Sequence, residues 1–182
     1  MNKYDFNNKL YLVTGGSGFL GVPLVERLLA DGANVRILAR DEGKLIEVKQ
    51  KYPQVDILNG DISDLFEVRQ AMKDVDGVFH LAASKHVGLA EITVRETIKA
   101  NTIGSMNILE CSLDKDLDFI VGISTDKAAQ VSGVYGASKL LMERLFTQFE
   151  RLNPNCDYRI VRYGNVLYST GSVLCKWKDL IE

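Results

Sequence analysis

The feature that most constrains the fold is a glycine-rich turn between a short apolar run and an amphipathic stretch. The run covers residues 9–14, the turn contains Gly15, Gly18 and Gly21, and residues 22–31 carry apolar side chains at helical spacing. Glycines in such a turn permit a tight bend, let the backbone approach a pyrophosphate and allow a helix to pack closely on a strand. The start of the helix offers unpaired N–H groups and a positive dipole end to phosphate. The pattern therefore favours a dinucleotide-binding turn over a purely structural one.

The rest of the chain alternates strand-sized apolar runs with amphipathic stretches. Such strands are typical of a parallel sheet that is covered on both faces, and right-handed crossovers give the strand order 3-2-1-4-5-6. The predicted fold class is α/β, a Rossmann-like doubly wound parallel sheet with helices on both faces, as one domain over residues 1–182. The expected strands are 9–14, 34–39, 55–58, 77–81, 119–123 and 158–161, and the expected helices are 22–31, 41–51, 64–73, 91–113 and 135–152.

Composition excludes several classes of partner. The net charge of −2 gives no basic surface for nucleic acid or anionic membrane. Residues 1–9 lack the apolar stretch of a signal peptide, and the apolar runs are too short to span a bilayer. We therefore expect a cytoplasmic protein. Cys111, Cys156 and Cys175 are odd in number and widely spaced, which predicts reduced and mostly buried thiols.

The end of the second predicted strand bears on the choice of cofactor. NAD-preferring folds place an acidic side chain there to hold the adenine ribose. In this chain Ala39 stands at that position and Arg40 follows, and a guanidinium pairs with a 2′-phosphate. NADP is therefore predicted in preference to NAD; the alternative is a solvated Arg40, with Asp41 holding the ribose. The other expected cofactor-binding residues are Gly15, Ser17, Gly18, Phe19, Leu20, Gly21, Asp61, Ile62, Ala82, Ala83, Tyr135 and Lys139.

Two short motifs carry the predicted chemistry. Tyr135 and Lys139 are four residues apart, so they share one face of a helix. The ammonium of Lys139 would lower the pKa of the Tyr135 phenol, and the tyrosinate would take a proton from a sugar hydroxyl as hydride leaves to nicotinamide. Thr125, Asp126 and Lys127 follow the fifth predicted strand and bring an acid and a base to the same volume. The alternative is that Asp126 and Lys127 form a surface ion pair at a strand end.

These motifs resemble those of the extended short-chain dehydrogenase/reductase superfamily, and the resemblance covers nearly the whole chain. More narrowly, the chain resembles the inverting UDP-N-acetylglucosamine 4,6-dehydratases of bacterial surface-sugar synthesis. The Thr-Asp-Lys triplet distinguishes these inverting dehydratases from two related groups of enzymes. The 4-epimerases usually lack this acid and base, and the retaining dehydratases carry Thr-Asp-Glu. A related branch replaces the tyrosine by methionine, whereas this chain keeps Tyr135. The segments that carry the resemblance are 85–87, 100–104, 124–129, 135–139 and 162–166.

The resemblance implies a role for each matching residue. Tyr135, assisted by Lys139, would oxidise C4 of the sugar, which acidifies the C5 proton. Lys127 would remove that proton while Asp126 protonates the departing 6-hydroxyl, and hydride then returns to C6 with inversion at C5. Asp126 has to be protonated when its leaving group departs, so its pKa must be tuned. Thr125 would hydrogen-bond the 4-hydroxyl and orient it.

Five further residues carry weaker expectations. Lys85 would aid reprotonation at C5 or contact a phosphate, and Asn165 would lie near the substrate's phosphates. His86 is a candidate for a substrate contact, although packing or a loop hydrogen bond explains it more simply. Asn101 resembles the superfamily's structural asparagine, which helps to place the catalytic lysine. His80 is most simply a core histidine, and with His86 it makes no metal site, because further ligands at suitable spacing are missing.

The family continues into a smaller C-terminal domain that holds the nucleotide-sugar, whereas this sequence ends at Glu182. Residues 168–182 resemble the start of that continuation, with Thr170 in place of an arginine and Lys176, Lys178 and Asp179 where the family is apolar. The substrate domain is thus expected to be essentially absent from the sequence, and the pocket for a UDP-sugar would be completed by another polypeptide, by a partner subunit or by residues outside this sequence.

Three functions stay open on this basis. The first is a UDP-N-acetylglucosamine 4,6-dehydratase, the second a short NADP-binding module without turnover, and the third a UDP-sugar 4-epimerase. The predicted helices 91–113 and 135–152 correspond to the superfamily's usual dimer face, so we expect a homo-oligomer.

Overall fold

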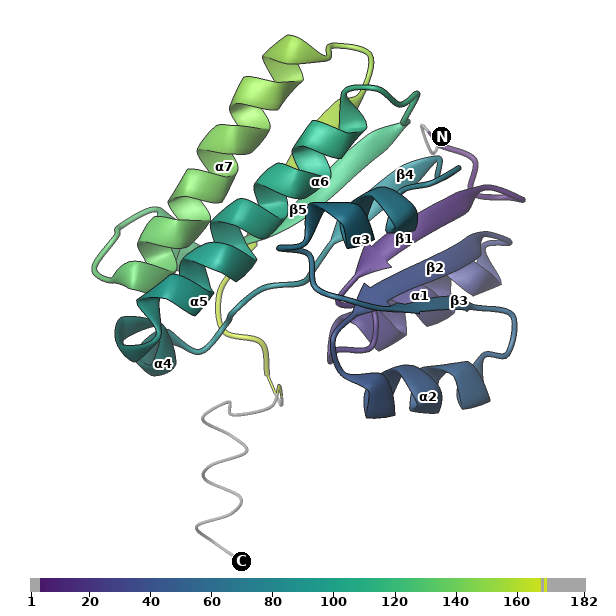
Figure 1. Ribbon diagram of the computed structural model, residues 1–182, viewed down its shortest axis with the longest axis horizontal. Coiled ribbons are helices and arrows are strands. Elements are labelled where there is room, and N and C mark those ends of the chain that lie inside the picture. Colours follow the sequence, from purple (N-terminus) through teal and green to yellow (C-terminus); the bar gives the residue numbers. More distant parts are fainter. Residues whose placement is uncertain (1–3, 168, 170–182) are drawn as a thin grey trace, which may run out of the picture.

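A computed structural model describes residues 4–167 and 169 of the protein. Its centre is one sheet of six parallel strands in the order β3-β2-β1-β4-β5-β6 (Figure 1). This confirms the predicted fold class and strand order. The strands are β1 (Leu10–Thr14), β2 (Asn34–Ala39), β3 (Asp56–Asn59), β4 (Gly77–His80), β5 (Phe119–Thr125) and β6 (Asp157–Tyr163).

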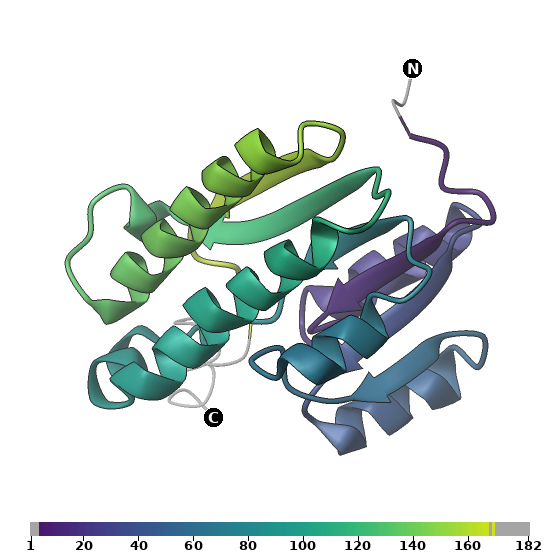
Figure 2. The same cartoon turned by 45° about the horizontal axis from the view of Figure 1, so that its top comes forward.

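Helices cover both faces of the sheet (Figures 1 and 2). On one face, Leu12 and Ile120 belong to a core shared with α3, α6 and α7. On the other face, Val13 and Ile37 pack with α1 and α2. The two cores follow from the period of two in a strand, which sends successive side chains to opposite faces. The helices on the two faces are α1 (Gly21–Ala30), α2 (Glu42–Lys51), α3 (Leu65–Ala71), α6 (Gly104–Ser112) and α7 (Val134–Leu152).

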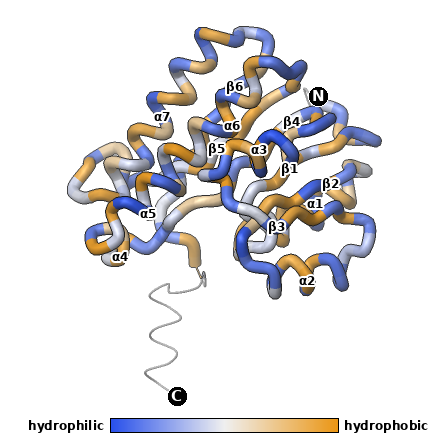
Figure 3. Tube along the Cα trace, viewed as in Figure 1, coloured by the Kyte–Doolittle hydropathy of each residue, from blue (hydrophilic) through white to orange (hydrophobic). Residues whose placement is uncertain are grey.

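Hydropathy along the trace follows this arrangement. Figure 3 shows hydrophobic stretches along the strands and alternating hydrophobic and hydrophilic turns along α7. Met142 and Phe146 of α7 are buried on the sheet side, one helical turn apart, whereas Leu141 is 53 % exposed. The spacing of apolar residues in the sequence thus sets which side of α7 meets the sheet.

The predicted single helix over residues 91–113 is wrong. The structure has two short helices, α4 (Val87–Ile92) and α5 (Val94–Ile98), and then a π-helical segment, Lys99–Ile103, that leads into α6. Thr93 separates α4 from α5 with non-helical dihedrals, φ −107° and ψ 55°. A π-helical turn shifts the residues that follow it around the helix axis, which hydropathy at a period of 3.6 does not reveal.

Cys111 and Cys156 are buried and free, as predicted, and burial raises the pKa of Cys156 to about 11. Cys175 and the family-like end of the chain, residue 168 and residues 170–182, lie outside the described residues. Within 4–167 and 169, no helix is both long and apolar enough to cross a membrane. The same residues contain no group of three or more histidine, cysteine or acidic side chains that could hold a metal ion.

Candidate active site

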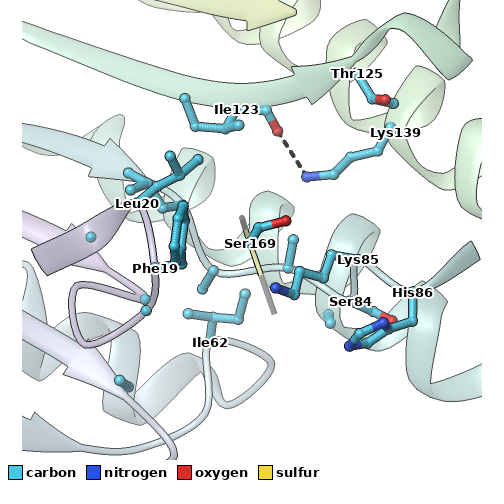
Figure 4. A pocket seen from close by; sticks show the side chains of 18 of the residues that line it. Phe19, Leu20, Ile62, Ser84, Lys85, His86, Ile123, Thr125, Lys139 and Ser169 are labelled. Atoms are coloured by element: carbon cyan, nitrogen blue, oxygen red, sulfur yellow. Dashed lines mark hydrogen bonds between the residues drawn. The ribbon is translucent and has the colours of Figure 1, made fainter. Parts of the chain in front are cut away.

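A cleft of about 780 Å³ lies at the carboxyl ends of the strands, where the strand order reverses between β1 and β4. This is the position at which open α/β sheets bind their ligands. Its walls come from the glycine turn after β1, the loops after β2, β3 and β4, the end of β5 and the start of α7 (Figure 4). The predicted site residues that line it are Gly15, Ser17, Gly18, Phe19, Leu20, Gly21, Arg40, Asp61, Ile62, Ala82, Ala83, Lys85, His86, Thr125, Lys127, Tyr135, Lys139 and Asn165.

The glycine turn has the shape of a phosphate cradle. Gly15 has φ +69°, and a Cβ there would meet the backbone nitrogen of Ala82 at 2.9 Å. A Cβ on Gly21 would meet the carbonyl oxygens of Gly15 and Gly16 at 2.5 Å. At Gly18 the nearest atom to an added Cβ is the Gly15 oxygen at 3.1 Å, so that position is open towards the cleft. The turn and the first turn of α1 therefore fit a dinucleotide pyrophosphate.

Two cations lie at the end of the cleft after β2. Arg40 Nη1 lies 3.6 Å from Asp61 Oδ2, with both side chains partly exposed. Asp41 does not face the cleft freely, because its Oδ1 accepts a hydrogen bond from the Lys44 backbone nitrogen and caps α2. That hydrogen bond and the neighbouring ammonium hold the pKa of Asp41 below its usual value. Lys44 also lines the cleft, and sequence analysis missed it, although its position three residues after Asp41 fits a residue of the first helical turn.

The end of β5 holds the predicted acid and base in contact. The Thr125 hydroxyl donates to Asp126 Oδ1 over 2.9 Å, and Lys127 Nζ donates to the same oxygen over 3.1 Å. Lys127 Nζ also donates to Asn165 Oδ1 over 3.3 Å. The hydrogen bonds from Lys127 and then Thr125 hold the pKa of Asp126 below its usual value. Asp126 is the one predicted site residue that does not line the cleft, and its side chain is 59 % exposed.

Tyr135 and Lys139 project from the first two turns of α7. Lys139 Nζ donates to the Ile123 carbonyl over 2.8 Å, and burial lowers the pKa of Lys139 to about 8 (Figure 4). The predicted lowering of the Tyr135 pKa by Lys139 is wrong for this state. Burial raises the pKa of Tyr135, and its interaction with the Thr125 side chain and the charge of Lys127 only partly oppose that effect.

Asn101 of the π-helical segment is fully buried and joins two walls of the cleft. Its Oδ1 accepts from the Ser84 backbone nitrogen over 2.8 Å, and its Nδ2 donates to the Ser84 carbonyl over 3.0 Å and to Ser138 Oγ over 3.0 Å. Ser138 in turn donates to the Tyr135 carbonyl over 2.8 Å. The bonds of Asn101 thus reach the loop after β4 and the start of α7, whereas Lys139 is held by Ile123.

Glu91 supplies the cap that α7 lacks. Gly133 precedes α7 and has no side chain to accept from the helix, and Glu91 Oε1 of α4 accepts from the Val134 backbone nitrogen over 2.7 Å. A carboxylate at this place also interacts favourably with the positive end of the helix dipole. Sequence analysis did not find this contact, because the two residues are far apart in the chain.

Lys85 and His86 lie on the loop after β4, on the opposite side of the cleft from Thr125 and Lys139 (Figure 4). His80 is 2 % exposed, which confirms a core histidine. The lining residues that sequence analysis did not name include Leu38, Lys44, Ser84, Glu96, Ile123, Tyr163 and Ser169. Most of them sit at strand ends or in loops, where apolar periodicity carries no information on orientation.

Several curated proteins are similar to this chain. An uncharacterized membrane protein of Methanocaldococcus jannaschii is 37% identical over 182 residues, which are 97% of this chain and 55% of that protein. An inverting UDP-N-acetylglucosamine 4,6-dehydratase of Campylobacter jejuni is 36% identical, again over 97% of this chain and 55% of its own length. A UDP-glucose 4-epimerase of Rickettsia bellii is 35% identical over 93% of this chain and 52% of its own length. The chain thus spans about half the length of these relatives.

Solved structures share the fold. Pen from Bacillus thuringiensis superposes with a TM-score of 0.94 at 31% identity, over 98% of this chain and 56% of that one. The dTDP-glucose 4,6-dehydratase DesIV from Streptomyces venezuelae, with NAD and TYD bound, superposes with a TM-score of 0.81 at 24% identity, over 94% and 62% of the two chains. The second likeness speaks for the fold alone.

A family model described as "Polysaccharide biosynthesis protein" matches residues 11–182. The chain belongs to this polysaccharide biosynthesis family, and its named relatives include nucleotide-sugar dehydratases and epimerases of the short-chain dehydrogenase/reductase type.

Proposed function

We propose that the chain carries the catalytic groups of an NADP-dependent 4,6-dehydratase that acts on UDP-N-acetylglucosamine. The observation that carries the proposal is the hydrogen-bonded set of Thr125, Asp126 and Lys127 at the end of β5, beside a cleft that Tyr135 and Lys139 also line. A 4-epimerase needs the tyrosine and the lysine of α7 but has no elimination to catalyse. The acid and base at the end of β5 therefore favour a dehydratase.

The first step of the proposed reaction is oxidation of the sugar at C4. Tyr135 accepts the proton of the sugar 4-hydroxyl, while Thr125 orients that hydroxyl. A bound nicotinamide supplies the acceptor and donor of hydride. The positive charge of Lys127 favours the tyrosinate, although burial opposes it in the free chain. Oxidation at C4 makes the C5 proton acidic enough for an amine base.

Lys127 and Asp126 support the elimination as a pair. Elimination needs a neutral amine at Lys127 and a protonated carboxyl at Asp126, and their 3.1 Å hydrogen bond gives a direct path for one proton to move between them. In the free chain the ionic form is favoured, because the side chains are 38 % and 59 % exposed. A bound sugar would exclude solvent from the pair. Loss of solvent raises the pKa of a carboxyl and lowers that of an amine, so it favours the neutral pair.

NADP is the cofactor that the end of β2 favours. Arg40 and Lys44 line the cleft there, and both are suited to a 2′-phosphate. Asp41, which would hold the ribose in an NAD-preferring site, is engaged as the cap of α2. We expect tighter binding of NADPH than of NADH. Equal affinities would contradict this preference.

The substrate pocket and the assembly are also proposals. Because the chain spans about half of its relatives, we propose that residues outside this sequence, for example those of a partner polypeptide, complete the pocket for the UDP group. We also propose a homo-oligomer through the helices within residues 91–113 and through α7, and exposed apolar side chains of α7 such as Leu141, at 53 %, and Leu152, at 58 %, support it. A single species of monomer mass in analytical ultracentrifugation would contradict the oligomer.

The test is to incubate the chain with NADP and UDP-N-acetylglucosamine and to follow the sugar by mass spectrometry. The expected product has lost one water. Lys127→Ala is expected to abolish that product while NADPH binding stays unchanged, because Lys127 acts in the elimination.

Tyr135→Phe is expected to abolish oxidation and with it elimination, whereas Lys127→Ala is expected to abolish elimination alone, so comparison of the two variants separates the steps. Epimerised sugar without loss of water, in the wild type and in Lys127→Ala alike, would favour the 4-epimerase. Bound NADPH without any product would favour a binding module without turnover.

A further inference from the structure

A chain of hydrogen bonds runs through the interior from β1 to the π-helical segment. Thr14 Oγ1 lies 2.8 Å from His80 Nδ1, and His80 Nε2 lies 2.9 Å from Ser105 Oγ. Ser105 Oγ donates to the Asn101 carbonyl over 2.8 Å, and Thr14 Oγ1 accepts from the Ala82 backbone nitrogen over 3.1 Å. Thr14, His80, Ser105 and Asn101 are each at most 2 % exposed.

The position of each proton in this series of hydrogen bonds follows from the groups at its two ends. A carbonyl only accepts, so the single hydroxyl hydrogen of Ser105 points to Asn101. His80 Nε2 must then donate to Ser105 Oγ. In a neutral ring Nδ1 is therefore an acceptor, and the Thr14 hydroxyl donates to it. The oxygen of Thr14 is left to accept from Ala82, which it does.

The ring stays neutral for physical reasons. Burial lowers the pKa of His80 to about 3, and the positive charge of Lys139 on α7 acts in the same direction. A second proton on Nδ1 would also point at the hydroxyl of Thr14, and that hydroxyl donates to the Nδ1 lone pair in the neutral ring. Both effects keep one tautomer.

Each end of the chain of bonds touches a wall of the cleft. Thr14 immediately precedes the glycine turn, and Ala82 lines the cleft after β4. At the other end, Asn101 holds both backbone polar groups of Ser84 and reaches α7 through Ser138. His80 is the only side chain among the described residues whose hydrogen bonds join these two ends directly, from β1 to α6.

We propose that His80, as its neutral Nε2–H tautomer, is a positioning residue that fixes the cofactor turn relative to the π-helical segment and thereby to the start of α7. Its role is independent of the reaction, since an epimerase, a dehydratase or a binding module would all need the two walls in register. The π-helical segment supports this role, because such segments concentrate at functional sites.

The tautomer is tested on the wild type by long-range ¹H–¹⁵N NMR of the imidazole rings. The chain has two histidines, so a His86→Gln variant assigns the spectrum. We expect His80 to show the neutral Nε2–H pattern without change between about pH 5 and pH 8, the range in which ordinary histidines titrate. An Nδ1–H pattern, or titration of His80 in that range, would overturn the proposal.

The positioning role is tested with two serine variants of the same helix. Ser105→Ala breaks the chain of bonds, whereas Ser112→Ala removes an equally buried hydroxyl of α6 that bonds Leu109 and Tyr158 instead. Neither serine lines the cleft. Amide hydrogen exchange at Ser84 is expected to accelerate roughly five- to tenfold in Ser105→Ala, as for the loss of one supporting hydrogen bond.

Ser112→Ala is expected to leave the exchange of Ser84 unchanged. NADPH affinity, followed by fluorescence, is expected to fall by a similar factor in Ser105→Ala only. Equal effects of the two variants on exchange would show that the bonds only stabilise the fold, and would overturn the proposal. If the wild type binds no dinucleotide, the proposed cofactor fails, while the exchange and the tautomer still decide on His80.

Discussion

Gly18 and Gly21 belong to the same turn, yet the structure gives them opposite consequences when each is replaced by alanine. The new methyl group at Gly21 would lie 2.5 Å from two carbonyl oxygens, those of Gly15 and Gly16. Both are backbone atoms, so α1 has to move away from the turn. Forcing a group into such a packed place costs about 1 to 3 kcal/mol of unfolding free energy.

At Gly18 the closest approach is a single oxygen at 3.1 Å, and the rest of the methyl group would occupy the cleft. A shift of a few tenths of an ångström relieves this one contact, so the change in unfolding free energy is expected to stay within about 0.5 kcal/mol. The methyl group would instead occupy the space of the pyrophosphate. We expect the Kd for NADPH to rise at least about tenfold, which corresponds to about 1.4 kcal/mol.

The assays are urea unfolding, followed by circular dichroism, and NADPH titration, followed by fluorescence, for the wild type and both variants. Gly18→Ala should keep the unfolding midpoint and lose affinity, whereas Gly21→Ala should lower the midpoint. Wild-type affinity in Gly18→Ala would refute the assignment of this turn as the cofactor cradle. A loss of stability in Gly18→Ala equal to that in Gly21→Ala would refute the packing argument.

Three other predictions concern α7. Glu91→Gln keeps an acceptor for the Val134 N–H and should cost up to about 1 kcal/mol of stability, while Glu91→Ala also loses the cap and should cost about 1 to 2 kcal/mol by urea unfolding. Glu143→Gln weakens the contact with Arg162, whose side chain is 44 % exposed, and should lower the urea midpoint at pH 7. The pKa of Glu143 is lowered in the fold, so this difference should shrink as the pH falls below about 4.3, and a constant difference would contradict it. Lys139→Met should raise the urea midpoint at pH 7, because it removes a buried ammonium. Wild-type Lys139 has a pKa of about 8 in the fold, so it loses its proton there as the pH rises, and the gain in midpoint should narrow between pH 8 and about 10. A gain that does not change with pH would argue against a lowered pKa.

The sheet and the glycine turn could be predicted because both depend on local patterns. A buried parallel strand is apolar along its length, and a right-handed crossover then leaves one common order of six strands. Gly15 and Gly21 signal the turn because a Cβ there would meet backbone atoms at 2.9 and 2.5 Å, whereas Gly18 leaves the cleft open. Tyr135 and Lys139 could be assigned to one helix face from their spacing alone.

Contacts between distant parts of the chain could not be predicted in this way. The family resemblance marks Asn101 as a structural residue, but its partners Ser84 and Ser138 are known only from the π-helical segment that turns it towards them. Glu91 caps α7 from another helix, and no sequence pattern within either helix predicts this contact. Hydropathy reports which residues are buried but not which buried polar groups meet, because that depends on how whole helices pack.

Protonation states also lay beyond the sequence. Burial raises the pKa of Tyr135 and lowers that of Lys139 to about 8, and hydrogen bonds from Lys127 and Thr125 lower that of Asp126. The proposed reaction needs the reverse at two places, since Tyr135 has to lose a proton and Asp126 has to hold one. Asp126 lies outside the cleft wall and is exposed, so its pKa rises only when something covers it. The side chains of the reaction are thus present at the end of β5 and the start of α7, and the surroundings that set their charges have to come from what binds over them.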